Sequence, residues 1–109
     1  MKGSIQKVDN KFTGNTTLAA VITNAAFQKA QLCKIAGMAQ DGYARSIRPV
    51  HTSADGDSIY ALSAGTVEAD MDLVGVLAAE VTSEAIKRAV YSADSAYGFP
   101  AAKDLGDIR

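Results

Sequence analysis

The sequence predicts an α/β (α+β) layered sandwich built on a strand-helix-strand-helix unit. Three observations lead to this prediction. Two short apolar runs are typical of buried strands, each is followed by a longer segment with helical periodicity, and the connections are long enough for crossovers. Two strands alone do not form an independently stable sheet. We therefore expect this unit to complete a sheet that it shares with a partner chain or an oligomer mate.

Composition limits the possible classes of protein. The chain has 109 residues, a hydrophobic content of 48% and a net charge of −1, which fits one small domain. Basic and acidic residues are interspersed, so the sequence shows no electrostatic footprint for nucleic acid or an anionic membrane. The N-terminal residues lack the apolar stretch of a signal peptide, and no apolar run approaches the ~20 residues of a membrane helix. The expected location is the cytoplasm.

The N-terminal half should contain a linker, a strand and a helix. Residues 1–15 have few apolar side chains, so we interpret them as a leader or linker ahead of a domain at residues 16–109. Residues 17–23 (TLAAVIT) are apolar on both alternating faces, the pattern of a central strand covered on both sides. Residues 28–45 follow a helical period. Their apolar stripe comprises Leu32, Ile35, Ala36, Ala39 and Tyr43.

Two residues of this first helix carry separate expectations. Gly37 lowers helix stability by up to ~1 kcal/mol relative to alanine, which indicates either close packing against another element or a tolerated glycine. Cys33 is the only cysteine, so the chain forms no internal disulfide and no cysteine metal cluster. We expect Cys33 to be a small buried side chain.

The C-terminal half should contain a loop, a strand and a long helix. Residues 48–57 form a loop with a turn near Asp55 and Gly56, and residues 58–65 (SIYALSAG) form the second strand. The second helix begins at Asp70, extends to about residue 95 and is stopped by Gly98 and Pro100. Its apolar stripe comprises Val74, Leu77, Val81, Ala85, Ala89 and Ala93.

A polar junction stands directly ahead of the first strand. Gly14, Asn15, Thr16 and Thr17 are turn-prone or hydroxyl-bearing, and this position holds a hydroxyl at a fixed place on the edge of a scaffold. Taken alone, the two threonines are more often ordinary turn or strand residues. The tripeptide Asn15-Thr16-Thr17 also fits a glycosylation sequon, which we set aside because no secretory signal precedes it.

Several motifs occur together along the chain. They are GNTTLAAVITNA, AQDGYAR, RPVHT, DGD and AVYSADSAYGFPAAKDL. In this combination, residues 14–105 closely resemble the C-terminal (β-subunit) portion of the aminopeptidase/nylon-oligomer hydrolase family, the self-cleaving N-terminal-nucleophile hydrolases that include the L-aminopeptidase/D-esterases.

The resemblance implies a site and a chemistry. In that family a longer precursor is cut before a serine or threonine, and the matching bond here is Asn15–Thr16. Thr16 would then be the nucleophile that forms an acyl-enzyme, with its freed α-amine, of reference pKa ~7.7–8.0, as the base. Asp55 and Asp57 match the family's acidic pair, whose carboxylates would orient the hydroxyl and stabilise the ammonium that forms during attack. The implied catalytic residues are therefore Thr16, Asp55 and Asp57.

The resemblance also implies what this chain needs from elsewhere. Family members carry a long segment ahead of the nucleophile that builds the substrate pocket and the oxyanion site, so activity would require an α-like subunit or an oligomer mate. The substrate would be a small amide or peptide, and its binding residues are unknown. No cofactor and no metal are implied. His51, the only histidine, is a candidate partner for a threonine nucleophile, but in the family pattern its VHT segment is structural or near the site.

Two other functions compete with the amidohydrolase. The first is a non-catalytic truncated homologue that acts as an oligomeric assembly module. The second is an acyltransferase of the ornithine acetyltransferase type, whose fold and processed threonine resemble this family. The acyltransferase ranks last, because the GNTT and DGD context resembles the amidase branch.

Overall fold

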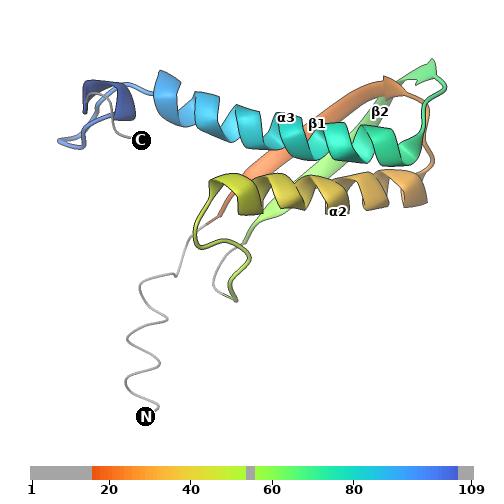
Figure 1. Ribbon diagram of the computed structural model, residues 1–109, viewed down its shortest axis with the longest axis horizontal. Helices are drawn as coiled ribbons and strands as arrows, with labels where there is room; N and C mark the ends of the chain where they lie inside the picture. The colour runs from red at the N-terminus through yellow and green to blue at the C-terminus, as the bar shows by residue number, and fades with distance from the viewer. Residues whose placement is uncertain (1–15, 54–55, 106–109) are drawn as a thin grey trace, which may run out of the picture.

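The computed structural model describes residues 16–53 and 56–105, and it shows two strands that alternate with two helices (Figure 1). The elements are β1 (Leu18–Ala25), α2 (Lys29–Ser46), β2 (Ser58–Val67), α3 (Met71–Ser92) and the short 3₁₀ helix η1 (Ala102–Asp104). The predicted order of strand, helix, strand and helix is confirmed. Residues 1–15, including Asn15, and Asp55 lie outside the described residues, so the predictions for them stay predictions.

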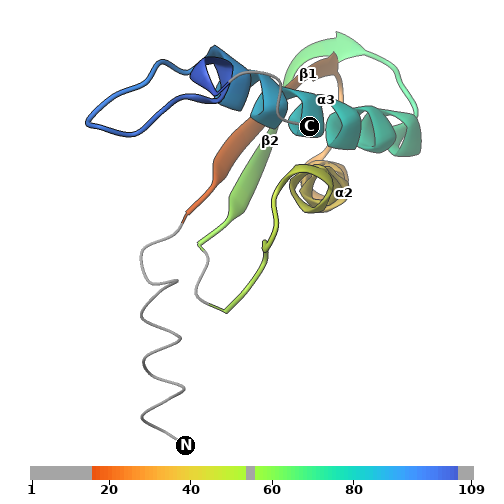
Figure 2. The ribbon, with the colours of Figure 1, turned by 60° about the vertical axis from the view of Figure 1, so that its left-hand side comes forward.

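The two strands form a parallel sheet, and α2 makes the crossover between them (Figure 2). The register runs from Leu18 opposite Ser58 to Thr23 opposite Ser63. Because the strands are parallel, the segment that leads into β1 lies beside the segment that leads into β2. This pairing brings residues about 40 positions apart in the chain to one edge of the sheet.

One face of the sheet carries both helices. Ile35 and Ala39 of α2 and Ala78 of α3 are buried, and they pack with inward-facing side chains of both strands. Those partners include Val21, Ile59 and Ala61. The core therefore lies between the two strands and the two helices.

The opposite face of the sheet is open. Leu18, Ile22 and Tyr60 are 68%, 69% and 65% exposed, and Leu62 is also exposed. Among the described residues only the helix-bearing face of β1 is covered, so cover of the other face stays a prediction. The apolar pattern predicts two covered faces, and α2 and α3 cover one of them.

The helices run parallel to each other and approach closely through small residues. An added Cβ on Gly42 of α2 would lie 2.6 Å from the carbonyl oxygen of Ala79 in α3, and one on Gly75 would meet the side chain of Met38. One turn beyond Gly42, the hydroxyls of Ser46 and Ser83 lie 2.6 Å apart. These contacts advance together along both helices, which defines a parallel pair with little space between the backbones.

Two residues of α2 take no part in these contacts between the helices. Gly37 is exposed and an added Cβ would meet nothing within 4 Å, so it is the tolerated glycine of the two alternatives. Cys33 is exposed, and the prediction of a buried cysteine is wrong. The face of α2 that packs against the sheet and α3 carries Ile35, Ala39 and Tyr43 instead.

Helix α3 begins as predicted, but it buries a different face. Asp70 caps it, with a carboxylate oxygen that accepts the N–H of Leu73 at 3.0 Å. The buried residues of α3 are small: Gly75, Ala78, Ala79, Thr82 and Ser83. Most of the predicted stripe is instead exposed, because α3 packs on α2 through its small residues. No helix in the described ranges has the length and hydropathy needed to cross a membrane.

Candidate active site at the start of β1

The candidate site lies where the chain enters β1. Thr16 is exposed and Thr17 is half-buried, directly before the first residue of the strand. Asp57 occupies the corresponding position before β2. One oxygen of the Asp57 carboxylate accepts the backbone N–H of Thr17 at 3.0 Å. The structure therefore brings one residue of the predicted acidic pair to the peptide unit that follows the predicted nucleophile.

Asp57 is held from two directions. Its second carboxylate oxygen accepts the N–H of His51 at 3.2 Å, and its side chain is 5% exposed. Hydrogen bonds from backbone N–H groups to a carboxylate are charge-assisted, and they are stronger than those between neutral groups. Asp57 thus joins the loop before β2 to the start of β1 and keeps a negative charge beside it.

Tyr43 also belongs to the site, although sequence reasoning assigned it only to the apolar stripe of a helix. It is fully buried in the last turn of α2, and its hydroxyl donates to the carbonyl oxygen of Ser58 at 2.8 Å. The carbonyl oxygen of Thr17 lies 3.3 Å from the same hydroxyl. The one signal in the sequence was the position of Tyr43 inside AQDGYAR, one of the motifs that carry the family resemblance.

The environment of Tyr43 keeps its hydroxyl protonated. Burial raises the pKa of Tyr43 above its ordinary value of 10.0, and the negative charge of Asp57 raises this pKa further. Both effects disfavour the phenolate. At neutral pH Tyr43 is therefore a neutral donor that ties α2 to the first residues of both strands.

His51 and Thr17 contact different oxygens of the Asp57 carboxylate. Its backbone has a φ of 61°, an uncommon conformation for a residue with a side chain, which the hydrogen bond to Asp57 helps to hold. One ring nitrogen lies 3.4 Å from the carbonyl oxygen of Gln40, and the ring centroid lies 5.9 Å from that of Tyr43. These contacts place His51 among the residues that shape the loop around Asp57.

Taken together, the contacts fix the backbone that follows Thr16. The N–H of Thr17 is bound by Asp57, while its carbonyl accepts the N–H of Ser58 at 2.9 Å and lies near Tyr43. These contacts restrain the peptide unit that joins Thr16 to Thr17. Within the described ranges, no group of three or more His, Cys, Asp or Glu side chains could hold a metal ion.

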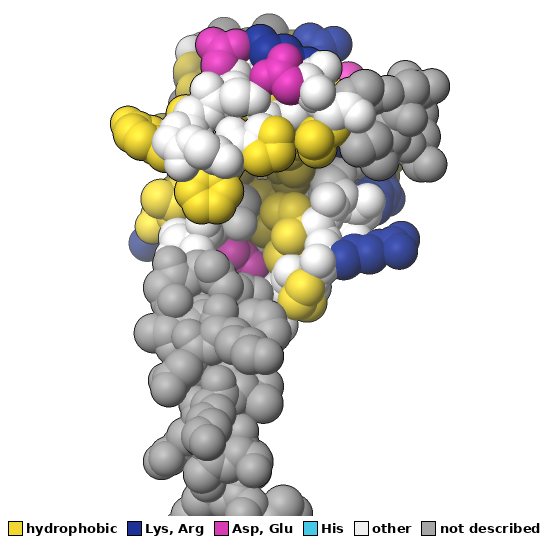
Figure 3. Space-filling model, turned by 90° about the vertical axis from the view of Figure 1, so that its left-hand side faces the viewer, with side chains coloured by type: hydrophobic (Ala, Val, Ile, Leu, Met, Phe, Trp, Pro, Cys, Tyr) yellow, Lys and Arg dark blue, Asp and Glu magenta, His cyan; other side chains and the backbone are white. Residues whose placement is uncertain are grey.

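An apolar groove begins at this site and runs between β1 and α3. Its volume is about 560 Å³, and Thr17 and Tyr43 contribute to its lining at the end near Asp57. Figure 3 shows hydrophobic side chains around a central hollow on this side of the molecule. The groove therefore extends along a large apolar surface from Thr17, the residue after the predicted nucleophile.

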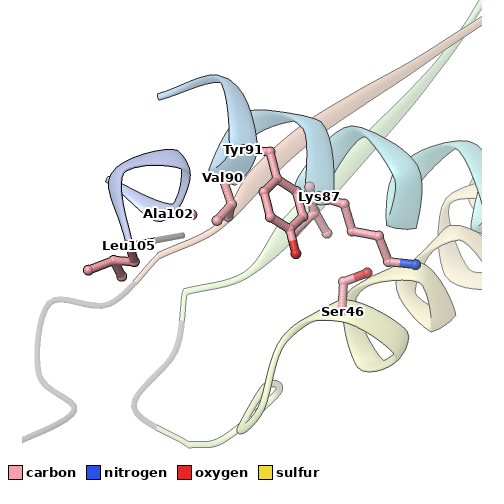
Figure 4. Close-up of a pocket in the computed structure, with 7 residues that line it drawn as sticks. Ser46, Lys87, Val90, Tyr91, Ala102 and Leu105 are labelled. Carbon is pink, nitrogen blue, oxygen red and sulfur yellow. The ribbon is translucent and has the colours of Figure 1, made fainter. Parts of the chain in front are cut away.

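A smaller cavity of about 290 Å³ adjoins the groove near the end of α3. Ile86 and Val90 line both spaces. Lys87 and Tyr91 extend from α3 toward Ser46 at the end of α2, and η1 closes the other side (Figure 4). Neither Thr16 nor Asp57, the two predicted catalytic residues that the structure describes, is among the described residues that line this cavity.

Comparison with known proteins adds independent information. Residues 2–103 match peptidase family S58. The chain is 39% identical to an uncharacterized aminopeptidase of Mycobacterium leprae, over 79% of this chain and 28% of that protein. It is 33% identical to an uncharacterized aminopeptidase of Mycobacterium tuberculosis, over 84% of this chain and 31% of that protein.

A more distant relative has a named substrate. The chain is 29% identical to the 6-aminohexanoate-oligomer endohydrolase of Paenarthrobacter ureafaciens, over 70% of this chain and 25% of that enzyme. In each of these comparisons the chain spans less than a third of the length of its relative.

Proposed function

Because the chain belongs to peptidase family S58, we propose that it is the β-subunit-like part of an N-terminal-threonine amidohydrolase or aminopeptidase. It would be cleaved at Asn15–Thr16 and would then hydrolyse small amide or peptide bonds. The names of its relatives, aminopeptidase and oligomer endohydrolase, support hydrolysis of amide bonds as the reaction class.

One observation carries this proposal. The peptide unit directly after Thr16 is anchored by Asp57, which is nearly buried and is itself held by a second backbone N–H. A nucleophile needs a fixed position relative to the bond that it attacks, because orientation supplies a large part of the rate enhancement. The contacts hold the N–H of Thr17, the residue directly after the one that the sequence motif designates, and this supports the proposal.

The proposed chemistry balances as an acyl transfer followed by hydrolysis. The hydroxyl of Thr16 attacks the carbonyl carbon of the amide, and its proton passes through the freed α-amine to the leaving amine. An ester bond forms as the amide C–N bond breaks. Water then cleaves the ester, which restores the hydroxyl and releases the carboxylic acid. Before processing, the nitrogen of Thr16 is an amide without basicity, so cleavage at Asn15–Thr16 creates the base.

Asp57 would act on this reaction through position and charge. Both of its oxygens accept backbone N–H groups, so it is suited to orient the Thr16–Thr17 peptide unit. Its negative charge also favours the ammonium that forms when the α-amine takes the proton. Asp55 lies outside the described residues, and its catalytic role stays a prediction.

The proposal requires a second, α-like chain or an oligomer mate. The relatives contain more than twice as much sequence outside the matched region as within it. Within the part of the chain that the structure describes, one face of the sheet is open and apolar. We propose that the α-like part covers this surface and supplies the substrate pocket and the donors for the oxyanion.

The open sheet face also favours a second candidate, a non-catalytic assembly module. Such a module would use the same exposed residues, Leu18, Ile22 and Tyr60, to bind a related full-length enzyme or another copy of itself. It would require neither cleavage at Thr16 nor the Thr16 hydroxyl.

Substitution of Thr16 separates the two candidates. The chain would be produced together with the part of the Mycobacterium leprae relative that lies outside the match, and intact mass and amide turnover would be read on the same samples. Thr16→Ala should abolish cleavage and turnover, whereas Thr16→Ser should retain part of both. Thr66→Ala, an exposed threonine near the end of β2, is the matched control and should leave both unchanged.

Two results would favour the assembly module instead. One is turnover by a chain that still begins at Met1. The other is undiminished turnover by Thr16→Ala.

A further inference from the structure

We propose that His51 is a positioning residue that acts through Asp57, so that the charge of its imidazole ring is transmitted to the Thr17 end of β1. The link runs from the ring to one oxygen of the Asp57 carboxylate, and from the other oxygen to the backbone N–H of Thr17. This link rests on the geometry of the chain alone. Its consequence for the nucleophile Thr16 rests on the proposed function.

The Asp57 carboxylate joins two parts of the chain through separate oxygens. Oδ1 accepts the N–H of Thr17 at 3.0 Å, at the start of β1. Oδ2 accepts the backbone N–H of His51 at 3.2 Å, and Nδ1 of the same histidine lies 3.8 Å from this oxygen. The Asp57 side chain is 5% exposed, so mainly protein groups surround its charge. A change of charge on the ring therefore acts on the carboxylate that holds Thr17.

The second ring nitrogen determines which group the ring presents to Asp57. Nε2 lies 3.4 Å from the carbonyl oxygen of Gln40 in α2. A carbonyl oxygen only accepts hydrogen bonds, so this contact places a proton on Nε2. The neutral ring then directs the lone pair of Nδ1 toward the Asp57 oxygen, whereas the protonated ring directs an N–H there. Protonation thus changes this contact from repulsion between two acceptors to attraction between opposite charges.

The backbone of His51 is held in the conformation that this link requires. Its φ of 61° lies in the left-handed region, which a residue with a side chain seldom adopts. Such conformations persist where the surroundings fix them, and they are concentrated at functional sites. Here the conformation brings both the backbone N–H and the ring of His51 to a single oxygen of Asp57.

Two titratable side chains of the described residues contact the ring of His51. Asp57, from the loop before β2, supplies the negative charge. Tyr43, from α2, has its ring centroid 5.9 Å away and stays neutral, because burial and then the charge of Asp57 raise the pKa of its hydroxyl. The side chain of His51 is 40% exposed, so its ring exchanges protons with water. Because His51 is the only histidine of the chain, its ring signals are unambiguous in a titration.

Nuclear magnetic resonance of the uncleaved full chain tests the link without any activity. Intact mass confirms that the chain begins at Met1, which keeps the nitrogen of Thr16 an amide that does not titrate. With isotope-labelled threonine, the amide signal of Thr17 should shift between about pH 5 and 8, with the same midpoint as the ring signals of His51. The amide of Thr66, near the other end of β2, is the control and should not shift. A Thr17 signal that stays in place, or that moves together with Thr66, would overturn the proposal.

Two substitutions locate the path of this effect. His51→Asn removes the ring but keeps the backbone N–H, and asparagine tolerates a positive φ. It should abolish the shift of Thr17 between about pH 5 and 8. In Asp57→Asn the ring of His51 should still titrate, while Thr17 should lose most of its shift, since the charge between them is gone. Circular dichroism checks that both variants fold, and the midpoints in the wild type decide if either does not. A Thr17 shift that persists in His51→Asn would overturn the proposal.

The pH dependence of turnover tests the consequence for the nucleophile. The complex contains the processed chain and the part of the Mycobacterium leprae relative outside the match. The charge of Asp57 favours the ammonium that forms at Thr16, and a protonated His51 offsets this charge. The acid limb of the wild-type kcat profile should therefore contain one ionisation more than that of His51→Asn, with KM changed less than about twofold. A merely structural role of His51 would not remove an ionisation from the profile.

The outcomes separate this proposal from the proposed function. Equal acid limbs in the wild type and His51→Asn would overturn the positioning role of His51. A Thr17 signal that follows His51 in a chain that is neither cleaved nor active in the complex would support the link and contradict the proposed function.

Discussion

At the scale of single residues, the structure shows which groups Asp57 and Tyr43 contact at the start of the two strands. Asp57 was expected from its motif, and its contacts explain what the motif accomplishes, since one carboxylate holds both the loop at His51 and the start of β1 at Thr17. Tyr43 adds a second anchor from α2 through Ser58. Near the predicted nucleophile, the Asp57 carboxylate thus accepts backbone N–H groups, whereas the neutral Tyr43 hydroxyl donates to a backbone carbonyl oxygen.

Removal of the Asp57 carboxylate should destabilise the fold. Asp57→Ala leaves the N–H groups of Thr17 and His51 without their acceptor in a nearly closed site, and we expect a loss of about 1–3 kcal/mol in the free energy of unfolding. Urea denaturation followed by circular dichroism measures it. Asp72→Ala, an exposed acidic residue in the first turn of α3, is the control and should cost less than about 1 kcal/mol. Equal losses in the two variants would contradict the anchoring role of Asp57.

Removal of the Tyr43 hydroxyl tests the second anchor. Tyr43→Phe should lower the free energy of unfolding by about 1–2 kcal/mol, because the half-buried Ser58 loses the donor to its carbonyl oxygen. Tyr60→Phe is the control, since Tyr60 is 65% exposed on β2, and it should change stability by less than about 0.5 kcal/mol. Urea titrations at neutral pH compare the two variants.

The raised pKa of Tyr43 predicts a dependence of stability on alkaline pH. The folded protein holds the Tyr43 proton more tightly than the unfolded chain, whose tyrosine titrates near 10.0. The contribution is fully present below pH 10.0 and is lost as the pH rises through the folded-state pKa. The free energy of unfolding should therefore decline above pH 10.0, and more steeply for the wild type than for Tyr43→Phe. Identical alkaline profiles would contradict the assignment.

At the scale of elements, the close approach of α2 and α3 depends on where their glycines lie. Sequence reasoning considered Gly37, which meets nothing, whereas Gly42 touches α3. Helical propensity is the same for both, so local sequence does not separate them. The distinction comes from the packing of α2 on α3.

These two glycines provide a matched prediction. Gly42→Ala should destabilise the protein by about 1–3 kcal/mol, because the new Cβ would lie 2.6 Å from the carbonyl oxygen of Ala79 and 2.8 Å from Cβ of Thr82. Gly37→Ala should stabilise it by about 0.5–1 kcal/mol through helix propensity. Thermal and urea unfolding of the two variants give the comparison. A Gly42→Ala protein at least as stable as the wild type would show that the helices do not pack as described.

At the scale of the whole molecule, the described residues bury few large side chains and expose many. Tyr43 and Ile35 are the largest that are fully buried. Leu18, Ile22 and Leu62 remain exposed on the open face of the sheet. A protein of this size has a small margin of stability, so an uncovered apolar face favours association.

We therefore expect the isolated chain to associate at micromolar concentration. Ile22→Lys should shift it toward monomer by placing a charge on the open face, whereas Ala30→Lys, on an exposed position of α2, should not. Sedimentation velocity over a concentration series measures the change. A well-folded wild-type monomer across that range would contradict the expectation.

Local patterns in the sequence were sufficient for the order of the elements. Periodicity and capping are properties of neighbouring residues, so they predicted a strand at residues 17–23 where β1 spans Leu18–Ala25, and a helix that begins at Asp70. The motifs were also sufficient for membership of peptidase family S58. Helix ends were less exact, since α3 ends at Ser92, ahead of the predicted residue 95.

Only the tertiary structure decided which apolar faces are covered and which residues meet. The placement of Asp57 against Thr17 depends on parallel pairing of strands 40 residues apart, and the role of Tyr43 depends on where α2 crosses them. A hydrophobic pattern shows that a face avoids water, but it does not specify the surface that covers it. For that reason the sequence determined the elements and the family, while the fold determined the anchored Thr17, the contact at Gly42 and the groove that remains open beside β1.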